Sequence, residues 1–156
     1  MVATISLLLG AIAVPGVEDS KDGHNAFVAD VLRVTNAERT ARGLGTVSEN
    51  EVLQRAAQWM AEDLAARDTL NHTDSWQRGL AKRLGGFGYE NARLLAENIA
   101  EGQATPTAVV NSWMQSPPHR GNLLHPEVRE AGVGHAINGR GHHYWVLDLG
   151  TRFNHP

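Results

Sequence analysis

Residues 132–149 read GVGHAINGRGHHYWVLDL, and this stretch decides the fold. Large and small side chains alternate through 132–137, which predicts a strand with Val, His and Ile on one face. The Asn138-Gly139 pair favours a two-residue hairpin turn, after which 142–149 is predicted to form a second strand. Apolar and aromatic residues occupy both faces of that second strand, so we expect it to be covered on both sides.

The segments that precede this hairpin are mainly helical in pattern. Apolar spacing and capping residues predict helices over 27–42, 48–64, 74–86 and 105–115. Ser48 with Glu51, and Asp74 with Gln77, have the spacing of a capping box and predict the starts of the second and third helices. Residues 93–100 have a strand-like pattern. Together these elements predict an α+β fold, a three-layer α-β-α sandwich around a small, mainly antiparallel sheet.

The length of 156 residues fits one domain, which we place at 26–156. The first 25 residues are expected to be a leader remnant and a polar linker, the linker spanning 17–25. Residues 5–14 form an apolar run that contains a stretch resembling a signal-peptide cleavage site. No Lys or Arg precedes this run, so a signal peptide and an N-terminal core segment or truncated start both stay open. The signal-peptide interpretation predicts a secreted or cell-envelope protein.

Composition excludes several classes of protein. The chain has no cysteine, which excludes disulfides, iron–sulfur clusters, thiolate zinc sites and a cysteine nucleophile. Its formal net charge is −3 and its arginines are scattered, so nucleic acid is not an expected partner. No apolar run reaches the roughly 20 residues of a transmembrane segment. Neither the G-x-S-x-G motif of serine hydrolases nor the HExxH motif of zinc proteases occurs.

Three polar residues stand in unexpected places. His72 follows the second predicted helix, and Glu97 interrupts the apolar run 94–100. His119 follows a double proline, whose rigid backbone would fix the direction of its ring. Each of them alone is more often structural than functional. They lie 25 and 22 residues apart, which is too far for a local motif, so only the fold could bring them together.

Six segments, in order, resemble the CAP superfamily, which groups cysteine-rich secretory proteins, antigen 5 proteins and plant pathogenesis-related proteins. The likeness is greatest to the cysteine-free bacterial branch with a sperm-coating-protein-like (SCP) domain. It covers residues 31–150 and rests on Asn36-Ala37-Glu38-Arg39, His72-Thr73, Ala96-Glu97-Asn98-Ile99-Ala100, WMQSPPHR at 113–120, Gly132-Val133-Gly134 and YWVLDLG at 144–150.

The resemblance implies an α-β-α sandwich with a surface cleft that carries two histidines and two acidic residues. His72 matches the first histidine, Glu97 the first acid and His119 the second histidine. The second acid falls three residues after a tryptophan in better-known members, and Ser116 occupies that position here. The tetrad is therefore incomplete, and whether Glu130 substitutes for the second acid stays open.

Two interpretations of this cleft compete. In the first, His72 and His119 bind a weak, exchangeable Zn²⁺, and Glu97 accepts a hydrogen bond from an imidazole or from metal-bound water. In the second, the three residues form a hydrogen-bonded network without metal. A two-residue turn would also place His135 opposite His142, either as a second metal site or as a pair of partly exposed hairpin residues.

The leading functional hypothesis is a secreted binding protein without established catalysis. Its ligand would be a divalent metal, a small molecule, a lipid or a cell-wall component. The alternative is a metal-dependent hydrolase of cell-wall or protein substrate, with zinc on His72 and His119 and with Glu97 as general base. A third hypothesis gives the cluster a purely structural role.

Overall fold

The computed structural model describes residues 17–153, and their side chains from Ala26 onward. The elements follow in the order α1 (Val17–Thr40), β1 (Ser48–Glu49), α2 (Glu51–Arg67), α3 (Leu80–Phe87), β2 (Ala92–Glu101), α4 (Pro106–Gln115), α5 (Pro117–Leu123), β3 (Glu130–Ile137) and β4 (His143–Arg152).

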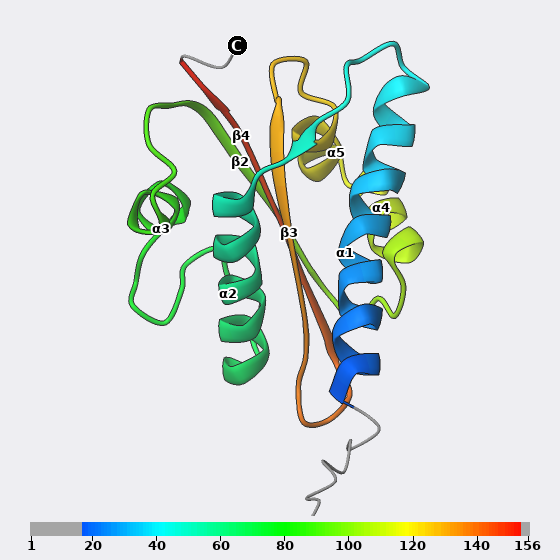
Figure 1. Ribbon diagram of the computed structural model, residues 1–156, viewed down its shortest axis with the longest axis vertical. Helices are drawn as coiled ribbons and strands as arrows, with labels where there is room; N and C mark the ends of the chain where they lie inside the picture. The colour runs from blue at the N-terminus through cyan, green and yellow to red at the C-terminus, as the bar shows by residue number, and fades with distance from the viewer. Residues whose placement is uncertain (1–16, 154–156) are drawn as a thin grey trace, which may run out of the picture.

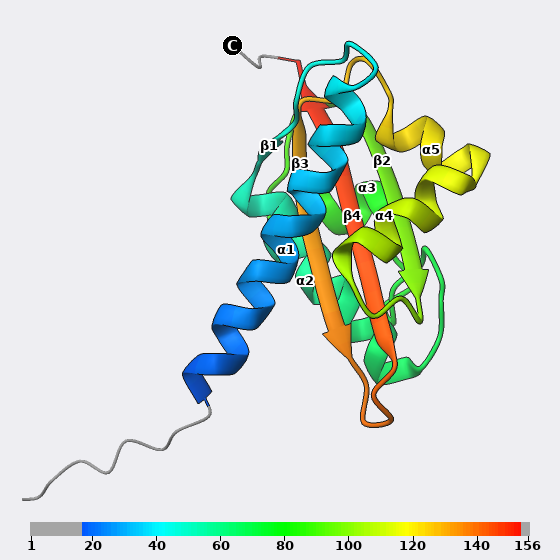
Figure 2. The ribbon, with the colours of Figure 1, turned by 90° about the vertical axis from the view of Figure 1, so that its right-hand side faces the viewer.

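The strands form a single sheet with the order β1-β3-β4-β2. β1 pairs parallel to β3, whereas β3 with β4 and β4 with β2 pair antiparallel. Helices α2 and α3 cover one face of this sheet, and α1, α4 and α5 cover the other (Figures 1 and 2). The predicted three-layer α-β-α sandwich is therefore confirmed.

Strand β4 contributes to the core on both faces, as the sequence predicted. Trp145, Leu147 and Leu149 are buried in a cluster with α1, α4 and α5. Tyr144 and Val146 are buried against α2 on the opposite face. Because successive strand residues point to opposite faces, one continuous apolar run supplies two layers of core.

Two predicted helix starts differ from the structure. Ser48 belongs to β1, and the cap of α2 is Asn50, whose side chain accepts hydrogen bonds from the backbone N–H groups of Val52 and Leu53. The third helix begins at Leu80 instead of Asp74. The Asp74 carboxylate does accept two backbone N–H groups, as a helix cap would. These hydrogen bonds close a turn, and no helix begins at this residue.

Of the expectations for the amino-terminal residues, the structure contradicts the linker. Residues 17–25, expected to be a linker, belong to α1. The apolar run 5–14 lies outside the described residues. Among residues 17–153, no helix combines the length and the apolar character needed to span a bilayer.

The β3–β4 turn is longer than predicted. Ile137 pairs with His143 and His135 with Trp145, so five residues connect the two strands. The Asn138 side chain accepts the backbone N–H groups of Arg140 and His142, and Gly141 has a φ of +78°. These contacts stabilise a wider loop, and the prediction that His135 opposes His142 is wrong.

Candidate functional site

Glu97 lies near the middle of β2, the strand at one edge of the sheet. Its side chain is only 2% exposed. One carboxylate oxygen accepts a hydrogen bond from Nδ1 of His72 at 2.8 Å, and the other pairs with Nη2 of Arg83 in α3. Because an ionised carboxylate can only accept, this contact assigns the proton of a neutral His72 to Nδ1 and leaves Nε2 unprotonated.

Arg83 also pairs with a second acid, which was not predicted from the sequence. Nη2 of Arg83 lies 3.2 Å from Oδ1 of Asp148, and both side chains are fully buried. Asp148 directly opposes Glu97 in the β2–β4 pairing. Burial, followed by the negative charge of Glu97, raises the pKa of Asp148 well above its ordinary value.

The signal for Asp148 was present in the sequence. Like Glu97, Asp148 is a single acid inside an otherwise apolar strand. What the sequence could not supply was the register that places the two acids opposite each other.

Helix α5 is attached to the same strand from the other face of the sheet. The Asn98 side chain donates to the backbone carbonyl of His119 at 3.0 Å. Asn122 donates to the Glu97 carbonyl at 3.2 Å and to the Asn98 side chain at 2.9 Å. Hydrogen bonds at His119 and at Asn122 thus attach α5 to the strand that carries Glu97.

The surroundings of the two imidazoles shift their pKa values in opposite directions. The hydrogen bond to Glu97 raises the pKa of His72, against a smaller opposing effect of desolvation. Burial, and then the charge of His72, lowers the pKa of His119. His72 contacts Glu97 directly, and the backbone carbonyl of His119 is bound by Asn98, the next residue along β2.

A cleft of about 250 Å³ opens beside His119. Its walls combine apolar and polar side chains: Leu70, Ile99, Ala100, Glu101, Gln103, Ser112, Trp113, Ser116 and His119. Of the four residues predicted for the binding cleft, Ser116 and His119 line it, whereas His72 and Glu97 are not among its lining residues. The Trp113 indole is buried and donates to the Ile99 carbonyl at 3.1 Å, which fixes the positions of these two cleft residues relative to each other.

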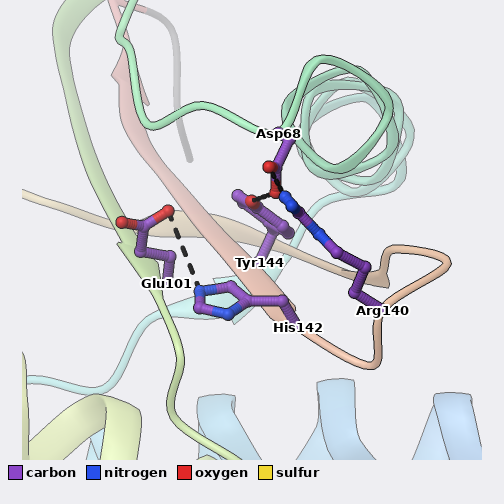
Figure 3. A pocket seen from close by; sticks show the side chains of 5 residues that line it. All are labelled: Asp68, Glu101, Arg140, His142 and Tyr144. Atoms are coloured by element: carbon purple, nitrogen blue, oxygen red, sulfur yellow. Dashed lines mark hydrogen bonds and ion pairs between the residues drawn. The ribbon is translucent and has the colours of Figure 1, made fainter.

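A second hollow, of about 400 Å³, lies at the β3–β4 turn and is lined by Asp68, Glu101, Arg140, His142 and Tyr144 (Figure 3). Asp68 accepts the Tyr144 hydroxyl at 2.7 Å and pairs with Arg140, and His142 lies 3.9 Å from Glu101. Glu101 is a lining residue of both hollows.

The other histidines and the other acid singled out from the sequence lie elsewhere in the fold. Nε2 of His135 lies 2.9 Å from Nδ1 of His143, not from His142, and the His135 ring stacks on Trp145 at 4.0 Å. Glu130 accepts hydrogen bonds from Tyr89, Asn50 and Arg152. This carboxylate belongs to a different cluster from the one around Glu97.

The two imidazoles of the site are not part of a larger ligand cluster. Across the described part of the chain, no group of three or more His, Asp or Glu side chains is arranged to hold a metal ion. His72 and His119 would together offer two imidazoles, and Ser116 would add only a neutral hydroxyl.

Comparison with known proteins gives a consistent result. The model of the cysteine-rich secretory protein (CAP) family matches residues 32–149. The chain is 33% identical to the uncharacterized protein YkwD of Bacillus subtilis over 115 residues, which is 74% of this chain and 44% of YkwD. It is 28% identical to the uncharacterized membrane protein YlbC of the same organism, covering 67% of this chain and 30% of YlbC. The chain thus spans less than half the length of these curated relatives.

Two solved structures have the same fold. One is an extracellular protein with an SCP domain from Bacillus anthracis, with a TM-score of 0.79, 20% identity, and coverage of 92% of this chain and 45% of that one. The other is an outer surface protein of Borrelia burgdorferi, with a TM-score of 0.72, 21% identity, and coverage of 89% of this chain and 96% of that one.

Proposed function

Because this chain belongs to the cysteine-rich secretory protein (CAP) family, we propose that it is a binding protein that takes a small ligand into the cleft beside His119. The observation that carries this proposal is the composition of the cleft. Leu70, Ile99 and Trp113 supply an apolar wall, and Ser116 and His119 supply hydrogen-bonding groups. Such a combination suits a small amphipathic molecule, with an apolar body and one polar end.

We propose that a ligand longer than the cleft extends towards the second hollow. The second hollow shares the lining residue Glu101 with the cleft and is rich in charged groups (Figure 3). An extended ligand would therefore place its apolar part beside Trp113 and a polar part near Glu101 and His142.

The geometry gives less support to a hydrolase. A general base must reach a substrate proton, but both oxygens of Glu97 are engaged, by His72 and by Arg83. Its side chain is also almost fully buried. An activated serine nucleophile is hydrogen-bonded to a general base such as histidine. Among residues 17–153, the Ser116 hydroxyl makes no such bond to His72 or His119.

Zinc binding to His72 and His119 stays a prediction. The contact between Nδ1 of His72 and Glu97 is the arrangement that orients a metal-binding imidazole, since it leaves Nε2 available. The donor set fits only a weak site, because Ser116 brings no charge. A bound ion would act as a Lewis acid or as an anchor for an anionic ligand group.

Placement outside the cytoplasm is part of the proposal. Support comes from the structural relatives, of which one is described as extracellular and the other as an outer surface protein. Detection of the protein in culture medium or in the cell-envelope fraction, with a cytoplasmic marker as control, tests this placement.

The binding proposal can be tested with octanoate, which has an apolar chain and one carboxylate. Titration monitored by NMR should shift the signals of Leu70, Ser116 and His119 in a saturable way. Leu70→Asp should weaken binding about tenfold, equivalent to about 1.4 kcal/mol. Ile137→Asp is the matched control, because Ile137 is 53% and Leu70 42% exposed but only Leu70 lines the cleft. Equal effects of the two variants, or no saturation, would contradict the proposal.

Metal binding and hydrolysis need separate measurements. Calorimetric zinc titration should lose its signal in both His72→Ala and His119→Ala, whereas Ser116→Glu should tighten binding by restoring the second acid. Zymograms on cell-wall material and casein, with and without a chelator, should show no clearing. Clearing that disappears with the chelator and in Glu97→Gln would establish the hydrolase instead.

A further inference from the structure

Glu97 and Asp148 form a pair of buried acids that share one positive charge. They face each other directly across β2 and β4, at 6% and 0% residue exposure. Both contact the same atom, Nη2 of Arg83. Directly opposed side chains in an antiparallel pair lie on the same face, so the two carboxyl groups are close neighbours.

The strand pairing brings these side chains especially near. The Gly102 N–H donates to the His143 carbonyl, which makes Gly102 and His143 a hydrogen-bonded pair. Hydrogen-bonded and non-hydrogen-bonded pairs alternate, so Glu97 and Asp148 are a non-hydrogen-bonded pair, the type with the shorter separation.

The charges of this group do not balance if both acids are ionised. One guanidinium would face two carboxylates, which leaves a net negative charge in the core. His72 contacts only Glu97 of the two acids, and its side chain is 59% exposed, so water screens its charge from the buried Asp148. One proton on either acid would make the group neutral.

The hydrogen-bond partners point to the acid that holds this proton. Both oxygens of Glu97 receive donors, from His72 and from Arg83. Oδ2 of Asp148 is buried and has no hydrogen-bond partner among the described residues. A carboxylate oxygen without a donor is a poor place for a buried negative charge, whereas a neutral carboxyl group tolerates it better.

We propose that Asp148 is the second acid of this site and that it is protonated at neutral pH, acting from behind Glu97 as a positioning residue. It does not reach the cleft, so it does not replace the acid that is absent at Ser116. Burial and the neighbouring Glu97 charge, which raise the pKa of Asp148, are consistent with this assignment.

The consequence for the site is a fixed Glu97. With Asp148 neutral, the positive charge of Arg83 is paired with Glu97 alone, and this pairing holds the Glu97 side chain turned towards His72. His72 is then held with its proton on Nδ1. Only a role of this oriented His72 in ligand binding rests on the proposed function, since the protonation of Asp148 is a property of the free protein.

The experiment measures protonation directly, without ligand or metal. In protein carrying ¹³C-labelled aspartate, the Cγ signal of Asp148 is assigned by its absence in Asp148→Asn. The expected result is a signal at the position of a protonated carboxyl group at neutral pH. A signal at the position of a carboxylate would overturn the proposal, whatever the octanoate titration shows.

Two variants separate positioning from general stabilisation. Asp148→Asn keeps a neutral group of the same shape and should preserve both the melting temperature and the NMR signal of the His72 Nδ1 proton. Asp148→Leu keeps a neutral side chain but removes the acceptor for Arg83, and should lose that proton signal. Loss of the signal in Asp148→Asn as well would show that the ionised form is required.

Discussion

Gly134 of β3 lies directly against the main-chain carbonyl of Ala57 in α2. A Cβ atom built on Gly134 would overlap the carbonyl group of Ala57 and approach the backbone nitrogen of Gln58. Gly132 has the same relation to Leu53. Helix α2 therefore packs on the sheet at backbone distance, which the absence of side chains at 132 and 134 permits.

Gly134→Ala should destabilise the fold strongly. The obstructing atoms belong to a helix backbone and cannot rotate away, so we expect a loss of about 3 kcal/mol, at the upper end of typical overpacking costs. Urea denaturation of the variant and the wild type measures this. Gly139→Ala is the control, because nothing lies within 4 Å of its added Cβ and its change should stay below about 0.5 kcal/mol. Similar losses in both variants would argue against the close packing.

The sequence was sufficient for the layers of this fold. Alternation in 132–137 and the two-sided apolar run 142–149 predicted two adjacent strands with helices on both faces, and the structure has them. The sequence-based prediction was wrong where the same residue can stabilise either of two local structures. Asp74 has the chemistry of a helix cap, yet its carboxylate closes a turn that ends before the first helical residue, Leu80.

The candidate site was predictable only in part. The sequence and its family resemblance pointed to His72, Glu97, Ser116 and His119, and the structure places His72 on Glu97 and lines one cleft with Ser116 and His119. Arg83 and Asp148 depend on helix placement and strand register, which no local pattern encodes.

The two imidazoles should titrate separately. We expect NMR to give His72 a pKa above, and His119 a pKa below, the ordinary histidine value of about 6.5. His72→Ala should raise the pKa of His119, since it removes the charge of His72, but only in part because burial remains. An unchanged His119 pKa in this variant would show that the two rings do not interact.

The raised pKa of His72 also makes the free energy of unfolding depend on pH. The raised pKa of His72 contributes stability that is fully present below the unfolded pKa and is lost as the pH rises through the folded pKa. Glu97→Gln should weaken this dependence above about pH 6.5.

Glu130 should contribute to resistance against acid. Burial alone would raise its pKa, but hydrogen bonds from Arg152, Tyr89 and Asn50 outweigh burial and lower it. A lowered pKa gives stability that is present above the unfolded value of about 4.3 and is lost as the pH falls through the folded value. Glu130→Gln should therefore show a shallower loss of stability below about pH 4.5.

Unfolding by urea over a series of pH values measures this slope. Glu127→Gln is the control, because Glu127 is half exposed in its pair with Arg93 and should leave the slope nearly unchanged. An acid slope in Glu130→Gln equal to that of the wild type would refute the assignment.

Arg39 joins α1 to the chain that follows α5. Its fully buried guanidinium donates to the main-chain carbonyls of Gly45 at 2.8 Å, Leu123 at 2.8 Å, His125 at 3.0 Å and Val128 at 3.4 Å. One side chain thus satisfies carbonyl groups in the loop after α1, at the end of α5 and in the segment that follows α5.

Arg39→Met keeps much of the apolar stem but removes every donor. Several buried carbonyls then lose their partner, and we expect a loss of about 3–5 kcal/mol in the free energy of unfolding. Arg42→Met is the matched control in the same helix region, because Arg42 is exposed and its ion pair with Glu38 should contribute less than about 0.5 kcal/mol. Chemical denaturation of both variants gives the comparison. If Arg39→Met cost no more than Arg42→Met, the connection between α1 and the segment after α5 would not depend on the guanidinium.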